Sequence, residues 1–198
     1  MSETTAMAQE KTGAIGPGRL VLVVGPSGAG KDTLLRLARA ACTDDPDVVF
    51  PRRVVTRASS ADEDNIAVST DEFARAREHG DFAVHWDAHG HSYALPQEIN
   101  DDIRAGRAVV VNVSRTVIAA LRQAYANVVV VAITAPPDVL AQRLAARARN
   151  SDGNIADRLA RSVDAASAQA DVMILNAGSA EYHGRQLVRV IRNEGWHE

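Results

Sequence analysis

The sequence has a single cysteine, Cys42, and therefore cannot form an internal disulfide bond. This fits a reducing compartment, and we expect Cys42 to be a small buried residue in a helix. No segment approaches the ~18 apolar residues of a membrane-spanning helix. Residues 1–17 also lack the apolar stretch that a secretory signal requires. These absences predict a cytoplasmic protein that does not have a membrane as a partner.

A net positive charge is also absent. The 198-residue chain has a formal net charge of −3. This argues against nucleic acid or an anionic membrane surface as the main partner, because proteins that bind either one present an extended basic surface. Only two of its 22 basic residues are lysines, Lys11 and Lys31. A length of 198 residues and a hydrophobic content of 46% suit one compact domain with a full core.

Short apolar runs alternate with longer amphipathic segments along the chain. The runs at 20–24, 109–113, 128–133 and 172–175 are unbroken, which is typical of strands buried on both faces. Helical patterns lie at about 32–42, 96–105, 115–125, 137–149, 154–169 and 180–193. This alternation predicts an α/β fold in which a parallel sheet is flanked by helices.

Two segments depart from this rhythm. Residues 1–18 are polar and rich in glycine, and we expect them to form a disordered tail before a domain at 19–198. Residues 52–94 contain shorter apolar segments around one helix near 70–79, whose start is marked by Ser69 and Glu72 in a capping-box pattern. We interpret 52–94 as a small inserted lobe that binds the substrate.

A glycine-rich segment follows the strand at 20–24 and opens the next helix. It consists of Gly25, Pro26, Ser27, Gly28, Ala29, Gly30 and Lys31, followed by Asp32 and Thr33. The glycines allow backbone N–H groups to turn toward phosphate oxygens, and the helix N-terminus adds its dipole. Lys31 would reach the β- and γ-phosphates as a point charge. Residues 25–33 therefore predict an ATP site and a kinase that phosphorylates a small anionic acceptor.

The residue after the lysine is Asp32, where such loops normally have serine or threonine. A carboxylate beside a triphosphate is favourable only if a cation lies between them, so Asp32 is the first candidate ligand for Mg²⁺, directly or through water. In the alternative, Asp32 caps the helix and the Thr33 hydroxyl binds the metal.

These residues resemble the guanylate-kinase-like branch of P-loop kinases from about residue 19 to 176. The resemblance is carried by the loop Gly25 to Lys31, the acceptor-phosphate segment Val55-Thr56-Arg57, the stretch His89-Gly90 with Tyr93 and Pro96, and the arginine-bearing lid at 143–161. The residues that read guanine in that branch are replaced here by Val84, Asn112, Ser114, Ser60 and Asn65. A site that lacks such partners loses discrimination steeply.

The chain is similar instead to the ribose 1,5-bisphosphate phosphokinases, which make 5-phosphoribosyl 1-diphosphate (PRPP) in phosphonate breakdown. The similarity covers GPSGAGKD with Asp32, RRVVTR at 52–57, the run from Glu63 to Ser69, and Val-Asn-x-Ser-Arg at 111–115. It implies ATP and Mg²⁺ as cofactors and a sugar phosphate as the acceptor. It also implies catalytic roles for Lys31, Arg147 and Arg158, and an acceptor site made of Arg53, Arg57, Tyr93, Asn112, Ser114 and Arg115.

Several alternatives stay open. A guanylate-type nucleoside monophosphate kinase would carry the same loop and lid, and a non-catalytic interaction module would share the fold but has little use for Lys31. Each arginine could instead be a solvated surface residue, for example Arg57 paired with Asp62 or Asp64. His85, His89 and His91 could form a zinc site, although we expect a tight turn at His89-Gly90. A homodimer is also open.

Overall fold

The computed structural model describes residues 13–57, 64–147 and 170–194, without the side chains of residues 144, 146 and 147. Within them, five strands form a parallel sheet in the order β2-β7-β1-β8-β9. These strands are β1 (Ile15–Val24), β2 (Val48–Val49), β7 (Ala108–Asn112), β8 (Tyr125–Thr134) and β9 (Val172–Leu175). The four apolar runs of the sequence are therefore confirmed as strands of one sheet.

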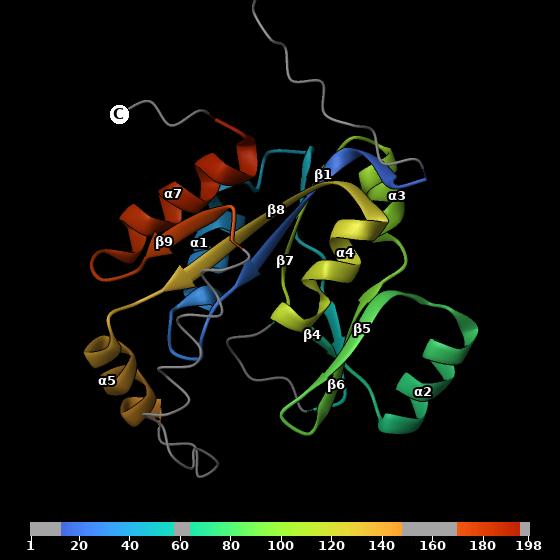
Figure 1. Cartoon of the computed structure of the whole chain (residues 1–198), viewed down its shortest axis with the longest axis horizontal. Coiled ribbons are helices and arrows are strands. Elements are labelled where there is room, and N and C mark those ends of the chain that lie inside the picture. The colour runs from blue at the N-terminus through green and yellow to red at the C-terminus, as the bar shows by residue number, and fades with distance from the viewer. Residues whose placement is uncertain (1–12, 58–63, 148–169, 195–198) are drawn as a thin grey trace, which may run out of the picture.

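Helices cover both faces of this sheet. One face carries α1 (Lys31–Ala41), α5 (Pro137–Arg147) and α7 (Ala180–Arg192), and the other carries α3 (Ile99–Arg104), η1 (Arg115–Val117) and α4 (Ile118–Ala124) (Figure 1). Strand β1 serves both sides, because Leu20 and Leu22 belong to one core cluster while Val21 and Val23 belong to the other. All four are fully buried. The predicted α/β fold is confirmed, and its core is divided by the sheet.

A second sheet forms the inserted segment. Its strands are β3 (Arg53–Val55), β4 (Asn65–Ala67), β5 (Phe82–Ala88) and β6 (His91–Pro96), in the order β4-β3-β6-β5, with α2 (Thr70–His79) beside them. The capping box at the start of α2 is confirmed, since Ser69 N donates to Glu72 Oε2 at 2.8 Å and Glu72 N donates to Ser69 Oγ at 3.2 Å. Figure 1 shows this small sheet and α5 on opposite sides of the molecule.

The turn between β5 and β6 is a two-residue hairpin at His89-Gly90. Both residues have positive φ, 52° and 76°, as a tight hairpin turn requires. The expected tight turn is therefore confirmed. His91 begins β6 after the turn, and His85 is an exposed residue of β5.

The structure differs from the tail expected at residues 1–18. Residues 1–12 lie outside the described part, but Ile15 already pairs with Tyr125 of β8. Gly18 packs so closely on α3 that a Cβ there would lie 2.6 Å from the Ile103 carbonyl oxygen of this helix. Gly18, one of the glycines that suggest a flexible tail, instead permits this close contact, and β1 starts at Ile15, so the boundary at residue 18 was wrong.

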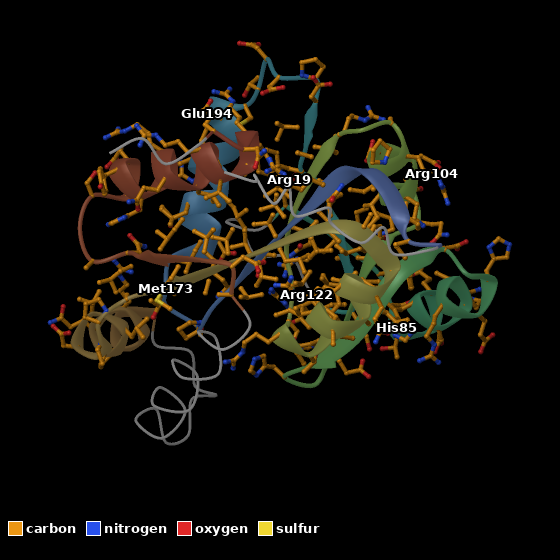
Figure 2. All side chains as sticks on the ribbon, turned by 45° about the horizontal axis from the view of Figure 1, so that its top comes forward. Arg19, His85, Arg104, Arg122, Met173 and Glu194 are labelled. Atoms are coloured by element: carbon orange, nitrogen blue, oxygen red, sulfur yellow. The ribbon has the colours of Figure 1, made fainter. Side chains whose placement is uncertain are left out.

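Side-chain contacts between distant elements connect these layers. Arg19 of β1 donates a hydrogen bond to the Ile191 carbonyl of α7, and Arg122 of α4 binds the Asp171 carboxylate at 2.7 Å (Figure 2). Cys42 is 4% exposed, which confirms its predicted burial, but it lies directly after the end of α1 and not within a helix. None of the described helices combines the length and apolar character that crossing a membrane requires. The expected helix at 154–169 lies outside the described residues.

Candidate active site

The glycine-rich loop occupies residues 25–30, between the carboxyl end of β1 and the start of α1. Gly25 has a φ of 148°, and a Cβ there would lie 2.0 Å from the Ile133 carbonyl oxygen of β8. Gly30 has a φ of 90°, and its Cβ would lie 2.3 Å from Asn176 Nδ2. A side chain at either position would collide with a neighbouring strand or its continuation, so these glycines hold the loop tightly against the sheet.

Lys31 is the first residue of α1 and bends back over the loop. Its Nζ donates to the carbonyl oxygens of Gly25 and Pro26, both at 2.9 Å. The ammonium group therefore lies at the loop and at the positive end of the α1 dipole, where an anion is favoured. The arrangement suits the phosphates of a nucleotide, which would compete with the two carbonyls for the lysine donors.

Asn176 and Arg143 support the loop from outside. The Asn176 amide donates to the Ala29 carbonyl at 2.9 Å, and Asn176 is only 3% exposed. Arg143 of α5 donates to the Gly28 carbonyl at 3.4 Å and to the Asn176 carbonyl at 3.3 Å. The role of Asn176 was not predicted from the sequence. Its signal was a polar residue directly after the apolar run at 172–175, at the edge of the sheet where ligands bind.

Asp32 and Thr33 lie in the first turn of α1, and both are half-buried. The N-cap is Gly30, which has no side chain, so the alternative that Asp32 caps the helix was wrong. The Asp32 carboxylate instead accepts from Asn112 Nδ2 at 3.4 Å. A carboxylate and a hydroxyl are oxygen donors of the kind that Mg²⁺ prefers, so the two residues fit the metal.

The other ligands of such a metal would come from outside the protein. Among the described residues, no group of three or more His, Cys, Asp or Glu side chains could hold an ion. Mg²⁺ in kinases commonly takes one or two protein oxygens and completes its shell with phosphate oxygens and water. The sparse donor set at Asp32 and Thr33 is consistent with that pattern.

A cleft of about 430 Å³ extends from Asp32 along α1 toward the inserted segment. Polar and charged side chains dominate its lining, which comprises Asp32, Leu35, Arg36, Arg39, Phe50, Pro51, Arg53, Asp64, Asn65, Val110 and Asn112. The cleft therefore touches α1, the end of β7 and strands β3 and β4. Its volume suits a small polar molecule.

Two of the predicted acceptor residues, Arg53 and Asn112, line this cleft and contact each other. Arg53 Nη1 donates to the Asn112 carbonyl at 3.2 Å, and its Nε donates to Asn65 Oδ1 at 3.2 Å. Arg53 also lies 5.8 Å from the centre of the Tyr93 ring. Backbone, amide and aromatic contacts thus hold one guanidinium at the wall of the cleft.

Tyr93 and Arg57 lie next to this group. Tyr93 is buried, its ring stacks on Trp86 at 5.7 Å, and the Arg57 guanidinium lies 6.0 Å from its centre. Tyr93 thus presents its ring to Arg53 and Arg57. Neither Arg57 nor Tyr93 lines the cleft itself, so acceptor roles for these two residues stay predictions.

The remaining predicted residues are less central. Ser114 accepts a hydrogen bond from Thr116 N at 3.4 Å at the start of η1, and Arg115 is the first residue of η1. Neither lines the cleft. The side chain of Arg147 and all of Arg158, Ser60 and the lid beyond residue 147 lie outside the described residues. The catalytic roles of Arg147 and Arg158 therefore stay predictions.

Asp64 organises the arginines at the far side of the cleft. Its carboxylate binds Arg39 at 2.5 Å and Arg52 at 2.7 Å. The hydrogen bond from Arg39 is the largest effect that lowers the pKa of this carboxyl, which therefore stays ionised. As all three side chains are well exposed, the bridges contribute little stability and mainly fix positions.

Comparison with known proteins places this arrangement in a family. The family model described as guanylate kinase matches residues 17–194. The chain is 85% identical to ribose 1,5-bisphosphate phosphokinase PhnN of Bradyrhizobium diazoefficiens over the whole of both chains. It is 62% identical to the protein of the same name from Rhodopseudomonas palustris, over 95% of each chain.

A solved structure supports the fold independently. The guanylate kinase of Anaplasma phagocytophilum superposes with a TM-score of 0.66 at 20% identity, covering 93% of this chain and 88% of that one. At that identity the likeness concerns the fold alone. Taken with the two relatives of high identity, it shows that the chain belongs to the guanylate kinase family, and within it to the ribose 1,5-bisphosphate phosphokinases.

Proposed function

We propose that the protein transfers the γ-phosphoryl group of ATP to the 1-phosphate of ribose 1,5-bisphosphate, which yields PRPP and ADP. The observation that carries the proposal is that the phosphate loop and an arginine-lined cleft meet at Asp32. A donor triphosphate on the loop and an anionic acceptor in the cleft would then be neighbours. Two relatives that are 85% and 62% identical are named for this acceptor, which supports the proposal.

The chemistry makes modest demands on the protein. An oxygen of the acceptor's 1-phosphate attacks the γ-phosphorus, a new P–O bond forms, and the bond to the β-phosphate oxygen breaks with its electron pair leaving on ADP. Since the attacking oxygen is already anionic, no strong general base is needed. The protein must instead bring two polyanions together, and cationic groups such as Lys31 achieve this.

The metal ligands, the lid arginines and the acceptor site would each contribute to this reaction. Mg²⁺ held by Asp32 and Thr33 would neutralise phosphate charge. Arg147 and Arg158 would contribute positive charge from the lid at 143–161. Arg53 and Asn112 would contact the acceptor directly. Arg57 and Tyr93 of the lobe at 52–94, together with Ser114 and Arg115 at the start of η1, would complete the acceptor site.

Phosphorus NMR tests the proposal directly. After the protein is mixed with Mg-ATP and ribose 1,5-bisphosphate, we expect the signals of a new diphosphate and of ADP. The same mixture with Lys31→Ala protein serves as the control. Absence of the new diphosphate from the wild-type mixture would contradict the proposal.

A panel of acceptors separates the proposal from its alternatives. We expect slow or no turnover of GMP, because amide, hydroxyl and apolar side chains replace the guanine-reading residues, and Arg53 occupies the wall of the cleft. Fast turnover of GMP would favour a nucleoside monophosphate kinase. ATP binding that does not depend on Lys31, without turnover of any acceptor, would favour an interaction module.

The cellular setting is part of the same proposal. A kinase that makes PRPP from a ribose bisphosphate would act in the cytoplasm, and we propose phosphonate catabolism as its setting. A homodimer remains an expectation, which light scattering of the purified protein measures.

A further inference from the structure

We infer that Arg36 binds the second phosphate of the acceptor, the one that does not receive the γ-phosphoryl group. Arg36 would thereby distinguish a sugar bisphosphate from a sugar monophosphate. This inference rests on the proposed function and extends it to a residue that the sequence did not single out. It would make Arg36 a specificity-determining residue of the cleft wall, one helical turn beyond Asp32.

The position of Arg36 follows from helix geometry. The α1 residues that line the cleft are Asp32, Leu35, Arg36 and Arg39, which share one helix face because they are spaced by three or four positions. Arg36 lies one turn beyond Asp32, a rise of about 6 Å along the axis. An acceptor whose reacting phosphate lies beside Asp32 would therefore extend along α1 toward Arg36.

The charges of the lining set Arg36 apart. Arg39 is engaged by Asp64, and Arg53 by Asn65 and Asn112. Arg36 is exposed, and no described residue forms a hydrogen bond or ion pair with its side chain. Arg36 is thus a cation of the cleft wall, and no carboxylate among the described residues binds its guanidinium group.

The chemistry of the acceptor matches this arrangement. Ribose 1,5-bisphosphate carries a phosphate at each end of a sugar, and a cleft that accepts it needs positive charge at both ends. Lys31 and a bound metal serve the end at the loop. The planar guanidinium of Arg36 can bind the second phosphate through two parallel N–H···O contacts. The neutral amides of Asn65 and Asn112 lie on the same lining, where hydroxyl groups would be bound.

Calorimetry on the full-length protein tests the inference, with ribose 1,5-bisphosphate and ribose 1-phosphate as the two ligands and no ATP present. We expect Arg36→Gln to weaken binding of the bisphosphate by about 10- to 100-fold, the range of one charge-assisted hydrogen bond. Binding of ribose 1-phosphate should stay within about twofold of wild type, because this ligand has nothing for Arg36 to hold. Arg36→Lys keeps the charge without the fork, so we expect an intermediate loss.

A matched control removes charge elsewhere. Arg189 of α7 is likewise exposed and lies outside the cleft, so Arg189→Gln should bind both ligands as wild type does. Equal loss of both ligands, or no loss of the bisphosphate in Arg36→Gln, would overturn the inference. Turnover reports separately on the proposed function. If wild type binds the bisphosphate through Arg36 but makes no PRPP, the inference about Arg36 stands and the proposed reaction fails. If wild type does not bind the bisphosphate, both are contradicted.

Discussion

At the scale of single residues, Lys31 is the side chain on which the proposed phosphoryl transfer depends most. It is the one lysine among the described residues, and it is held by two carbonyl oxygens of the loop at 2.9 Å each. Those bonds place the ammonium group but do not bury it, since Lys31 is only half-buried. Replacing it should therefore affect catalysis far more than folding.

We predict that Lys31→Ala lowers kcat by on the order of 10²-fold or more, by analogy with the removal of one preorganised donor. The midpoint of thermal unfolding should change little. Lys31→Arg should not restore the rate, because the larger planar group cannot follow the transferring phosphoryl group as a point charge. Steady-state kinetics and a thermal melt measure both effects, and a variant with kcat within threefold of wild type would contradict the role.

Asp32 allows a second prediction at this scale. Asp32→Ser removes a carboxylate that lies in the first turn after the loop and contacts Asn112. If Asp32 ligates Mg²⁺, the magnesium concentration that gives half-maximal activity should rise by about tenfold, the lower end of the effect of losing a group that supports a metal. The measurement is a magnesium titration at saturating ATP. If the magnesium requirement is unchanged, Thr33 and not Asp32 would be the metal ligand. Thr33→Val is the matched comparison.

At the scale of elements, a buried hydrogen bond joins the start of β8 to α3. The Tyr125 hydroxyl donates to Asn100 Oδ1 at 2.6 Å, and the two residues are 2% and 5% exposed. Burial raises the pKa of Tyr125 to about 12, so the hydroxyl remains protonated in the folded protein. This bond helps to position α3, which packs against β1 and its close-fitting Gly18.

We predict that Tyr125→Phe lowers the free energy of unfolding by about 1–3 kcal/mol near neutral pH, because Asn100 Oδ1 is left buried without its donor. The pKa of Tyr125 is raised in the folded state, so the stabilisation is fully present below its unfolded pKa of about 10 and is lost as pH rises through about 12. Denaturant unfolding at a series of pH values measures this. The difference between wild type and variant should shrink over that window, and a constant difference would contradict the assignment.

At the scale of the whole molecule, the two core clusters on either side of the sheet unfold together if the domain is cooperative. Cys42 reports on one of them, since it packs at the end of α1 in the cluster that also contains Leu187 and Ile191 of α7. Burial is the largest effect that raises the pKa of its thiol. Low access and a small thiolate fraction both slow its reactions.

We predict that Cys42 of the folded protein reacts with a thiol reagent at least about 10²-fold more slowly than in denaturant, because reaction requires opening of the structure. Mg-ATP should slow the reaction further, since a ligand that binds only the folded state disfavours opening. Lys31→Ala should lose this protection by ATP. A spectrophotometric thiol assay measures the rate, and rapid labelling without any change in circular dichroism would contradict the prediction.

The sequence alone determined the features that depend on neighbouring residues. Consecutive apolar residues predict the strands of the parallel sheet, Ser69 and Glu72 predict the start of α2, and the glycines with Lys31 predict the phosphate loop. Each pattern lies within a short stretch of chain, so its physical cause can be recognised without knowledge of the fold. The first half of β1, residues 15–19, was missed, because the pairing of Ile15 with Tyr125 of β8 spans more than 100 residues.

The tertiary structure alone decided which distant residues share the site. Asn176 supports Ala29 across 147 positions, and Arg53 contacts Asn112 across 59. The same is true of the cleft, whose wall combines one face of α1 with strands from both sheets. The physical reason is that a hydrogen bond or cleft wall requires closeness in space, and sheet order together with helix packing determines this closeness.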